Sequence, residues 1–367
     1  GMTARIGFRG GVADEPVVRA GFIGCGSHSF RNLYPALQFA PVRLAATCDL
    51  DAAKAQAFAR QFGADAWYTD YRRMLAEAEM DAVFVCTGYD ARGRPLYPQI
   101  VADGLRAGKH VWFEKPPAAS CAEIELLQSL AAAAGRNAMV GLKKMFFPAN
   151  EKARELMQSE EFGRAHLVTI QYPQAVPTVE EFKAYGAGEP VALVKWFLDH
   201  FCHPAALMVY LLGMPETLFY ERSAAAGGVA TFTFAGGAVA VISLTAGAAT
   251  NGGMERTMIV GEKGRHITIE NNVRVTLHRQ PPVGYGDAPS YHVGGPESAN
   301  AVWEPEFSLG QLYNKGLFLL GYWGEINEFA RSVLEQRPPT KGTLQHAWQV
   351  TRIFEGFAGG PGRRVRL

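Results

Sequence analysis

The chain has 367 residues, which is long enough for two domains. Hydrophobic residues make up 48% of it and charged residues 19%, the balance of a globular protein with well-filled cores. The formal net charge is only +1 and the lysines and arginines form no basic block, so no nucleic acid and no membrane surface is expected as a partner.

The cysteines and the hydropathy of the chain further restrict the class of protein that the sequence can encode. The five cysteines are scattered and odd in number, which favours buried thiols in a reducing compartment over a disulfide framework. No CxxC pair occurs, so no metal site is expected. No run of about 18 apolar residues predicts a membrane span, and residues 1–16 lack the apolar centre of a signal peptide. We therefore expect a cytoplasmic protein in which residues 1–16 are a lead-in and Gly1 is left from expression.

Residues 17–143 alternate between short apolar runs and amphipathic stretches. Continuous apolar runs predict buried parallel strands, and the amphipathic stretches between them predict helices. The pattern is typical of an α/β domain with a doubly wound parallel sheet, the Rossmann architecture. The strands are predicted at residues 17–24, 43–49, 82–87, 110–113 and 138–142, and the helices at 30–39, 52–62, 71–76, 96–107 and 124–134.

Residues 144–367 have a different rhythm, because β-type runs follow one another without helices between them. This predicts a C-terminal α+β domain with a large, mostly antiparallel open sheet, used for substrate binding and oligomerisation. Residues 279–304 are rich in Pro and Gly without a period and are predicted to form a long loop. The strands are predicted at 166–172, 216–221, 229–234, 238–245, 256–260, 266–269 and 273–277, and the helices at 149–158, 193–212, 323–336 and 342–357.

A glycine turn and an acidic residue indicate a dinucleotide site. Gly24 and Gly26 lie between a predicted strand and a predicted helix, where a tight turn lets a pyrophosphate approach the backbone. Ser29 replaces the third glycine of the usual fingerprint. Asp49 ends the second strand, about twenty residues on, where a carboxylate accepts the ribose hydroxyls of NAD and repels the extra phosphate of NADP. The alternative for Asp49 is a helix cap, although Asp51 is better placed for that role.

Two further segments are placed to carry chemistry. Glu114-Lys115-Pro116 follows a predicted strand at the carboxyl edge of the parallel sheet, where ligands of such sheets bind. Asp199 and His203 lie four residues apart in a predicted helix, so their side chains share one face. With the glycine turn, these segments resemble the glucose–fructose oxidoreductase/inositol dehydrogenase (Gfo/Idh/MocA) family over nearly the whole chain.

The resemblance implies roles for individual residues. The catalytic group would be Lys115, Asp199 and His203, and the peptide bond between Lys115 and Pro116 would be cis. The coenzyme contacts would be Gly24, Gly26, Ser27, His28, Ser29, Asp49, Thr87, Glu114 and Lys115.

The chemistry of these residue types agrees with such roles. Oxidising a secondary alcohol requires a base for the hydroxyl proton, and histidine is the ready candidate. Lys115 can polarise the same oxygen, and Asp199 can orient the imidazole or bind a neighbouring hydroxyl. The alternatives are a surface lysine and a plain i,i+4 ion pair of Asp199 with His203. A metal cluster with His200 and Cys202 is disfavoured, because consecutive positions on one helix cannot all point inward.

The chain also departs from the family pattern. Ala206 stands where an aspartate is common, and Met145 where an arginine is common. Gly88 replaces a proline and is followed by an insertion at 89–95, with Tyr97 nearest to the position of a missing histidine. These changes leave the hydride machinery intact and put the identity of the substrate in doubt.

Candidate substrate contacts are Tyr172, Lys195 and Trp196, of which the last two lie one turn before Asp199. For any single aromatic residue, anchoring in the core is the alternative.

Together the motifs predict an NAD(H)-dependent oxidoreductase that transfers hydride to or from a secondary alcohol carbon of a sugar, sugar derivative or cyclitol. One alternative is an enzyme that retains NAD and uses transient oxidation for epimerisation, elimination or glycoside cleavage. Another is a non-catalytic NAD-binding sensor or regulator, which would not need Lys115, Asp199 and His203. A homo-oligomer, a dimer or tetramer formed through the C-terminal sheet, is expected because its open face would otherwise leave apolar surface in water.

Overall fold

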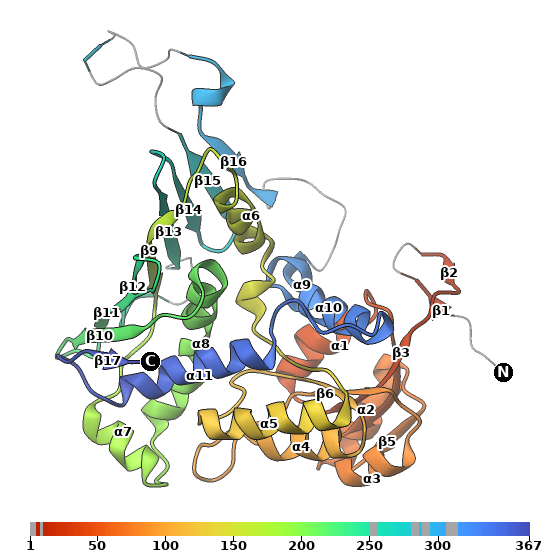
Figure 1. Cartoon of the computed structure of the whole chain (residues 1–367). Helices are drawn as coiled ribbons and strands as arrows, with labels where there is room; N and C mark the ends of the chain where they lie inside the picture. Colours follow the sequence, from red (N-terminus) through yellow and green to blue (C-terminus); the bar gives the residue numbers. More distant parts are fainter. Residues whose placement is uncertain (1–4, 8–9, 250–254, 280–285, 288–293, 306–314) are drawn as a thin grey trace.

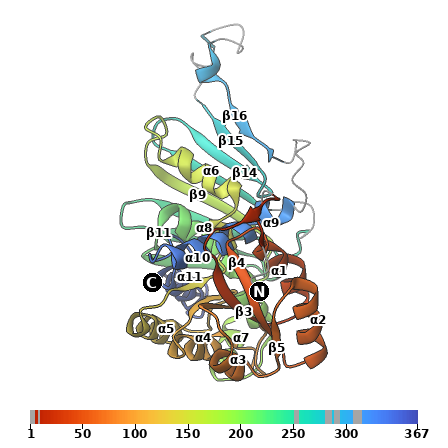
Figure 2. The ribbon, with the colours of Figure 1, turned by 90° about the vertical axis from the view of Figure 1, so that its right-hand side faces the viewer.

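The computed structural model describes residues 5–7, 10–249, 255–279, 286–287, 294–305 and 315–367. The N-terminal half forms one lobe around a parallel sheet, and a larger sheet rises from the other lobe (Figure 1). Turning the molecule by 90° shows the large sheet standing above the N-terminal lobe (Figure 2). Within the described ranges, no helix has the length and apolar character needed to cross a membrane.

The first sheet confirms the predicted Rossmann architecture. Its six strands are all parallel and are ordered β5-β4-β3-β6-β7-β8. From β3 the chain adds β4 and β5 on one side and then β6, β7 and β8 on the other, so the order of strand addition reverses between β3 and β6. The carboxyl ends of strands at such a reversal form the crevice in which open α/β sheets bind ligands. The strands are β3 (Val18–Ile23), β4 (Val42–Cys48), β5 (Ala66–Tyr68), β6 (Ala82–Val85), β7 (His110–Phe113) and β8 (Ala138–Val140).

The helices of this lobe follow the strands as expected, with one correction. The predicted helix at 30–39 is a π-helical turn, η1 (Ser29–Leu33), followed by the short α1 (Tyr34–Leu37). Pro35 has no N–H to donate, and the Tyr34 N–H bonds to the Ser29 carbonyl in a wider turn. The others are α2 (Ala52–Phe62), α3 (Tyr71–Glu77), α4 (Tyr97–Arg106) and α5 (Cys121–Ala134).

The second sheet has nine strands in the order β16-β15-β14-β13-β9-β12-β11-β10-β17. All neighbours are antiparallel except β12 and β9, which confirms a mostly antiparallel sheet. The strands are β9 (Ala165–Tyr172), β10 (Thr217–Arg222), β11 (Gly228–Thr233), β12 (Val239–Leu244), β13 (Arg256–Gly261), β14 (His266–Glu270), β15 (Arg274–His278), β16 (Ala301–Trp303) and β17 (Val365–Arg366).

Several of the shortest strands and helices of the structure were not predicted from the sequence. The predicted loop at 279–304 contains η3 (Pro296–Ser298) and β16, which pairs with β15, while residues 280–285 and 288–293 lie outside the described residues. The hairpin of β1 (Arg5–Ile6) and β2 (Val12–Ala13) falls in the lead-in. Runs of two or three residues carry no measurable periodicity, so only their pairing partners reveal them.

Helices between the two sheets carry several site residues. After β8 come η2 (Lys143–Met145) and α6 (Pro148–Met157). Before the large sheet continues, the chain forms α7 (Val179–Gly186) and α8 (Ala192–Leu212). The sequence analysis missed α7, whose capping box of Thr178 and Glu181 is a local signal that could have revealed it.

The end of the chain returns to the Rossmann lobe. Its helices are α9 (Lys315–Leu319), α10 (Tyr322–Leu334) and α11 (Leu344–Phe357). On α10, the ring of Phe329 lies 5.3 Å from that of Phe84 in β6, and Trp323 Nε1 donates to the Phe39 carbonyl at 2.8 Å. Helix α10 thereby brings residues from the far end of the sequence to the coenzyme crevice.

Candidate functional site

The glycine turn leaves room for a ligand at the end of β3. Gly24 has φ +114°, and a Cβ there would lie 1.8 Å from the Cys86 carbonyl oxygen, so only glycine fits. At Gly26 a Cβ would meet nothing within 4 Å, so the backbone faces open space. The turn is therefore shaped for close approach of a phosphate to the backbone.

A cleft of about 580 Å³ opens beside this turn. Asp49 lies at its edge, where its carboxylate accepts from the backbone N–H groups of Cys25 and Asp51, each at 2.9 Å. The helix-capping role belongs to Asp51, which accepts from the first turn of α2, so Asp49 is not used as the cap. The lining includes Gly24, Gly26, Ser27, His28, Ser29, Asp49, Leu50, Tyr71, Thr87 and Ile100.

Thr87 marks the inner end of the cleft. The Tyr97 hydroxyl donates to the Thr87 carbonyl at 2.8 Å and accepts from its N–H at 3.2 Å. Among the described residues the Thr87 Oγ1 atom is buried without a hydrogen-bond partner. An open glycine turn, an edge carboxylate and a buried hydroxyl with spare capacity fit a dinucleotide in this cleft.

Glu114 connects the glycine turn to the catalytic segment. Asn32 donates to His28 Nδ1 at 3.0 Å, and His28 Nε2 donates to Glu114 at 2.8 Å. Glu114 also accepts the Lys115 N–H at 2.9 Å. Burial alone would raise the pKa of Glu114, but its hydrogen bond with His28 and the charge of Lys115 hold that pKa below its usual range. An ionised Glu114 therefore ties the two segments together.

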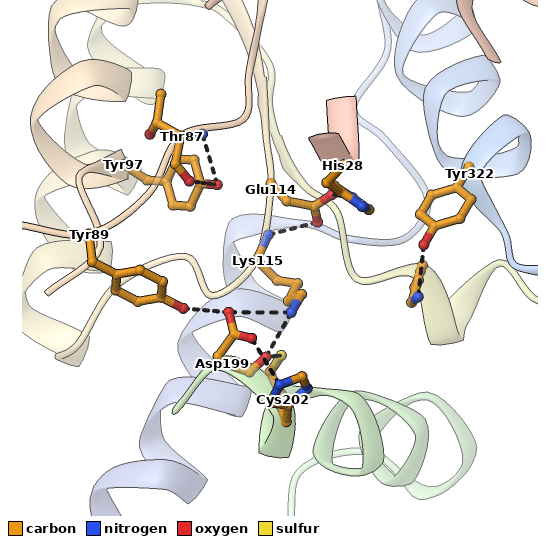
Figure 3. Close-up of polar contacts among 11 residues, drawn as sticks. His28, Thr87, Tyr89, Tyr97, Glu114, Lys115, Asp199, Cys202 and Tyr322 are labelled. Atoms are coloured by element: carbon orange, nitrogen blue, oxygen red, sulfur yellow. Dashed lines mark hydrogen bonds and ion pairs between the residues drawn. The ribbon is translucent and has the colours of Figure 1, made fainter. Parts of the chain in front are cut away.

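Lys115 and Asp199 meet below the crevice, as Figure 3 shows. Lys115 Nζ donates to the Asp199 carbonyl at 2.9 Å and lies 3.5 Å from its Oδ1 atom. Burial would lower the pKa of Lys115, but Asp199 and Glu114 keep it above its usual value. The Lys115–Pro116 peptide bond is cis, as the family resemblance implied. Lys115 is thus a half-buried, protonated donor.

Two residues that the sequence analysis did not assign also contact Asp199. The Tyr89 hydroxyl, from the insertion at 89–95, donates to Asp199 Oδ1. His200 Nε2 lies 3.3 Å from Oδ2. Tyr97, the residue closest in sequence to the missing histidine, bonds to Thr87 instead. The insertion at 89–95 was visible in the sequence as a departure from the family pattern. The contact of Tyr89 with α8 was not predicted, because it joins residues of the two lobes.

His203 lies one turn beyond Asp199 and is buried. Burial, and then the charges of Lys115, Lys143 and Lys144, hold its pKa well below the usual value, so the imidazole is neutral. The described structure has no hydrogen bond or ion pair between His203 and Asp199. The rings of His203 and Tyr172 lie with their centroids 6.4 Å apart.

The other candidate substrate contacts lie next to this group. The ring of Trp196 stacks on His200 with centroids 5.6 Å apart, and 52% of its surface is exposed. Lys195 Nζ lies 4.9 Å from the centre of the Tyr89 ring. The structure therefore gathers these residues around Asp199, at the solvent side of the site.

Two more lysines come from η2. Lys144 is buried and bonds to Glu255 and, at 2.9 Å, to Asn272. Burial lowers its pKa despite the neighbouring Glu255. Lys143 is half-buried, and its Nζ donates to the Tyr322 hydroxyl of α10 at 3.0 Å. Across the described part of the chain, no group of three or more His, Cys, Asp or Glu side chains could hold a metal ion.

The arrangement can be compared with known proteins. Residues 18–142 match the model of an oxidoreductase family with an NAD-binding Rossmann fold, and residues 150–267 match the GFO/IDH/MocA C-terminal domain. The chain belongs to the Gfo/Idh/MocA oxidoreductase family. Its first domain is accordingly an NAD-binding Rossmann domain.

Individual relatives of the family are distant. An uncharacterized oxidoreductase, YrbE, of Bacillus subtilis is 24% identical over 66% of this chain and 71% of its own length. A D-xylose 1-dehydrogenase (NADP(+)) of Haloferax volcanii is 31% identical over 54% of this chain and 58% of its own length. The crystal structure of a dehydrogenase from Chromobacterium violaceum has a TM-score of 0.75 at 22% identity and covers 95% of this chain and 96% of the other. The last likeness concerns the fold.

Proposed function

We propose that this protein is an NAD(H)-dependent dehydrogenase that acts on a CH–OH carbon of a sugar, sugar derivative or cyclitol. The observation that carries the proposal is the Lys115 ammonium, whose side chain is only 15% exposed and is held on Asp199 beside the coenzyme cleft. A lysine so largely withdrawn from water beside a carboxylate, just past the carboxyl end of β7, is costly to maintain for stability alone. The sugar-active D-xylose relative supports the substrate class.

The cleft residues would hold the coenzyme. Gly26, Ser27 and Ser29 line the turn that would face the pyrophosphate, and Asp49 would accept the adenosine ribose hydroxyls. When bound, NAD supplies a ring that accepts or returns a hydride. NAD is favoured over NADP because the Asp49 carboxylate repels a 2′-phosphate, and its neighbour is the 94% exposed Leu50 rather than an arginine.

The chain's own residues would handle the proton and the oxygen. Lys115 stays protonated and can donate to the reacting oxygen, stabilising negative charge as it develops there. The neutral imidazole of His203 can accept the hydroxyl proton during oxidation and return it during reduction. Asp199 orients Lys115, and Tyr172, Lys195 and Trp196 would contact the rest of the substrate.

The proposal is tested by mixing the protein with inositols, hexoses, sugar acids and amino sugars in the presence of NAD or NADP, and following absorbance at 340 nm. We expect reduced coenzyme with at least one substrate, and a loss of about 10²- to 10⁴-fold in kcat/KM for Lys115→Ala. Lys183→Ala, an exposed lysine on α7, is the matched control and should behave as the unmodified protein.

A second readout separates the alternatives. If no substrate yields reduced coenzyme although thermal shift shows that NAD binds, net dehydrogenation is ruled out for the panel. Incorporation of solvent deuterium into a panel sugar would then favour an enzyme that retains NAD. Its absence would favour a binding protein.

A further inference from the structure

Lys143 differs from Lys115 and Lys144 in that no carboxylate among the described residues pairs with its ammonium group. Lys115 has Asp199 within ion-pair distance, and Lys144 has Glu255. Within the described residues, no carboxylate lies within ion-pair distance of Lys143. Its ammonium group donates to the Tyr322 hydroxyl at 3.0 Å and lies 4.9 Å and 5.9 Å from the ring centres of Tyr322 and Phe147. A half-buried ammonium group next to two other lysines and without a counter-ion is unfavourable, and an anion placed there would relieve the cost.

Tyr322 completes a pair of donors. Its hydroxyl accepts from Lys143, so its own proton remains available for another acceptor. Burial, and then the charge of Glu114, raise the pKa of Tyr322, so the phenol keeps that proton. The ring is buried at the start of α10 and lies 5.5 Å from the His28 ring, which fixes it beside the coenzyme turn.

The donor pair belongs to the catalytic site. The positive charge of Lys143 acts on Lys115, His200 and His203 alike. Figure 3 shows Tyr322 on the opposite side of Lys115 from Tyr89. None of the nearby acids neutralises Lys143, since Glu114 bonds to His28 and Asp199 bonds to Tyr89 and Lys115. The third, Glu325 of α10, is buried with a pKa raised well above its usual value, so it keeps its proton.

We propose that the substrate is a polyhydroxy acid, and that Lys143 and Tyr322 bind its carboxylate while Lys115 contacts the reacting CH–OH group. The inference rests on the proposed function and specifies its substrate class. A carboxylate suits the pair because one ammonium and one phenol offer two adjacent donors and one positive charge. A phosphate would call for the planar fork of an arginine or a cradle of backbone N–H groups, and Lys143 and Tyr322 supply neither.

The test compares hexuronates with the hexoses of the same ring configuration, using D-glucuronate against D-glucose and D-galacturonate against D-galactose. In the unmodified protein we expect the acid to have the higher kcat/KM. Lys143→Met should lower the acid-to-hexose ratio of kcat/KM about ten- to hundred-fold, mainly through KM. Tyr322→Phe should lower it less, and Lys183→Met is the matched control that should leave the ratio unchanged.

Binding gives a readout that does not depend on turnover. Calorimetric titration of the NADH-loaded protein with each hexuronate should show affinity that Lys143→Met weakens and Lys143→Arg largely retains. A preference for the uncharged hexose, an equal loss for both sugars in Lys143→Met, or tighter binding of a hexose phosphate would overturn the inference. Uronate binding that depends on Lys143 without any hydride transfer would support the site and reject the proposed dehydrogenase activity.

Discussion

At the scale of single residues, Asp199 is the meeting point of the candidate site. Its carboxylate contacts Lys115, Tyr89 and His200, and its carbonyl accepts from Lys115 and from the Cys202 thiol. The sequence analysis paired Asp199 with His203 by helical spacing, yet the structure commits the carboxylate to groups from three other positions. Spacing within one helix identifies which residues share a face, but it does not reveal what reaches that face from outside.

Tyr89 is expected to position Asp199 rather than to touch the substrate. Tyr89→Phe removes one hydrogen bond to a charged acceptor, so we expect kcat to fall about tenfold with little change in KM. Steady-state kinetics on the substrate found above would measure the split. Tyr185→Phe is the control, because the Tyr185 hydroxyl also holds the insertion, through the Gly93 carbonyl, without contacting Asp199. Equal losses in the two variants would mean that Tyr89 only anchors the insertion.

At the scale of elements, α10 carries two glutamates in opposite environments. Glu325 is fully buried, and both its carboxylate oxygens lack a partner among the described residues. Burial, and then the charge of Glu114, raise its pKa well above the usual value. Burial would also raise the pKa of Glu328, but hydrogen bonds from Arg337 and Thr340 hold it below the usual value. One helix therefore holds a protonated and an ionised carboxyl group.

Glu325 should make the protein less stable as the pH rises. Below the pKa of a glutamate in the unfolded chain, about 4.3, both states carry the proton and the free energy of unfolding is unaffected. Above it the unfolded chain releases the proton while the folded chain keeps it, so stability falls by up to about 1.4 kcal/mol per pH unit until the folded pKa is reached. Glu325→Gln should remove this loss.

The measurement is thermal or urea unfolding of Glu325→Gln and the unmodified protein between pH 5 and pH 8. We expect the Tm advantage of the variant to grow with pH. Glu328→Gln is the contrasting control, since losing its pair with Arg337 should cost about 1 kcal/mol at neutral pH and less in acid. A constant difference between Glu325→Gln and the unmodified protein would show that Glu325 does not hold its proton.

At the scale of the whole molecule, the described part of the chain leaves one face of the large sheet uncovered. Figure 1 shows α6 and α8 along one side of it, and on that side the alternate residues of the strands are buried. On the other side, Val239, Leu167 and Val260 lie in register across three strands and are only half-buried. Met258 continues this apolar surface in the next row.

We propose that a second copy of the chain covers this face. Light scattering at micromolar concentration should report a dimer or tetramer, because a continuous apolar row in the middle of a sheet is unfavourable in water. Met258→Glu should shift the protein toward monomer, whereas Val302→Glu, on the edge strand β16, should not. A monomer in the unmodified protein would contradict the proposal.

The sequence by itself determined the two sheets, the coenzyme turn and the position of Lys115, because each depends on local signals. Apolar runs predict strands, and Gly24 and Gly26 between a strand and a helix predict the tight turn. The structure adds the reason for glycine at position 24, since a side chain there would collide with the Cys86 carbonyl. The site beyond Lys115 was decided by tertiary structure. Tyr89 and Asp199 are 110 residues apart and Lys143 and Tyr322 are 179 apart, and no local pattern relates them. Only the contacts of α8 and α10 with the Rossmann lobe bring these residues together, and these contacts decide which charges of the site are paired.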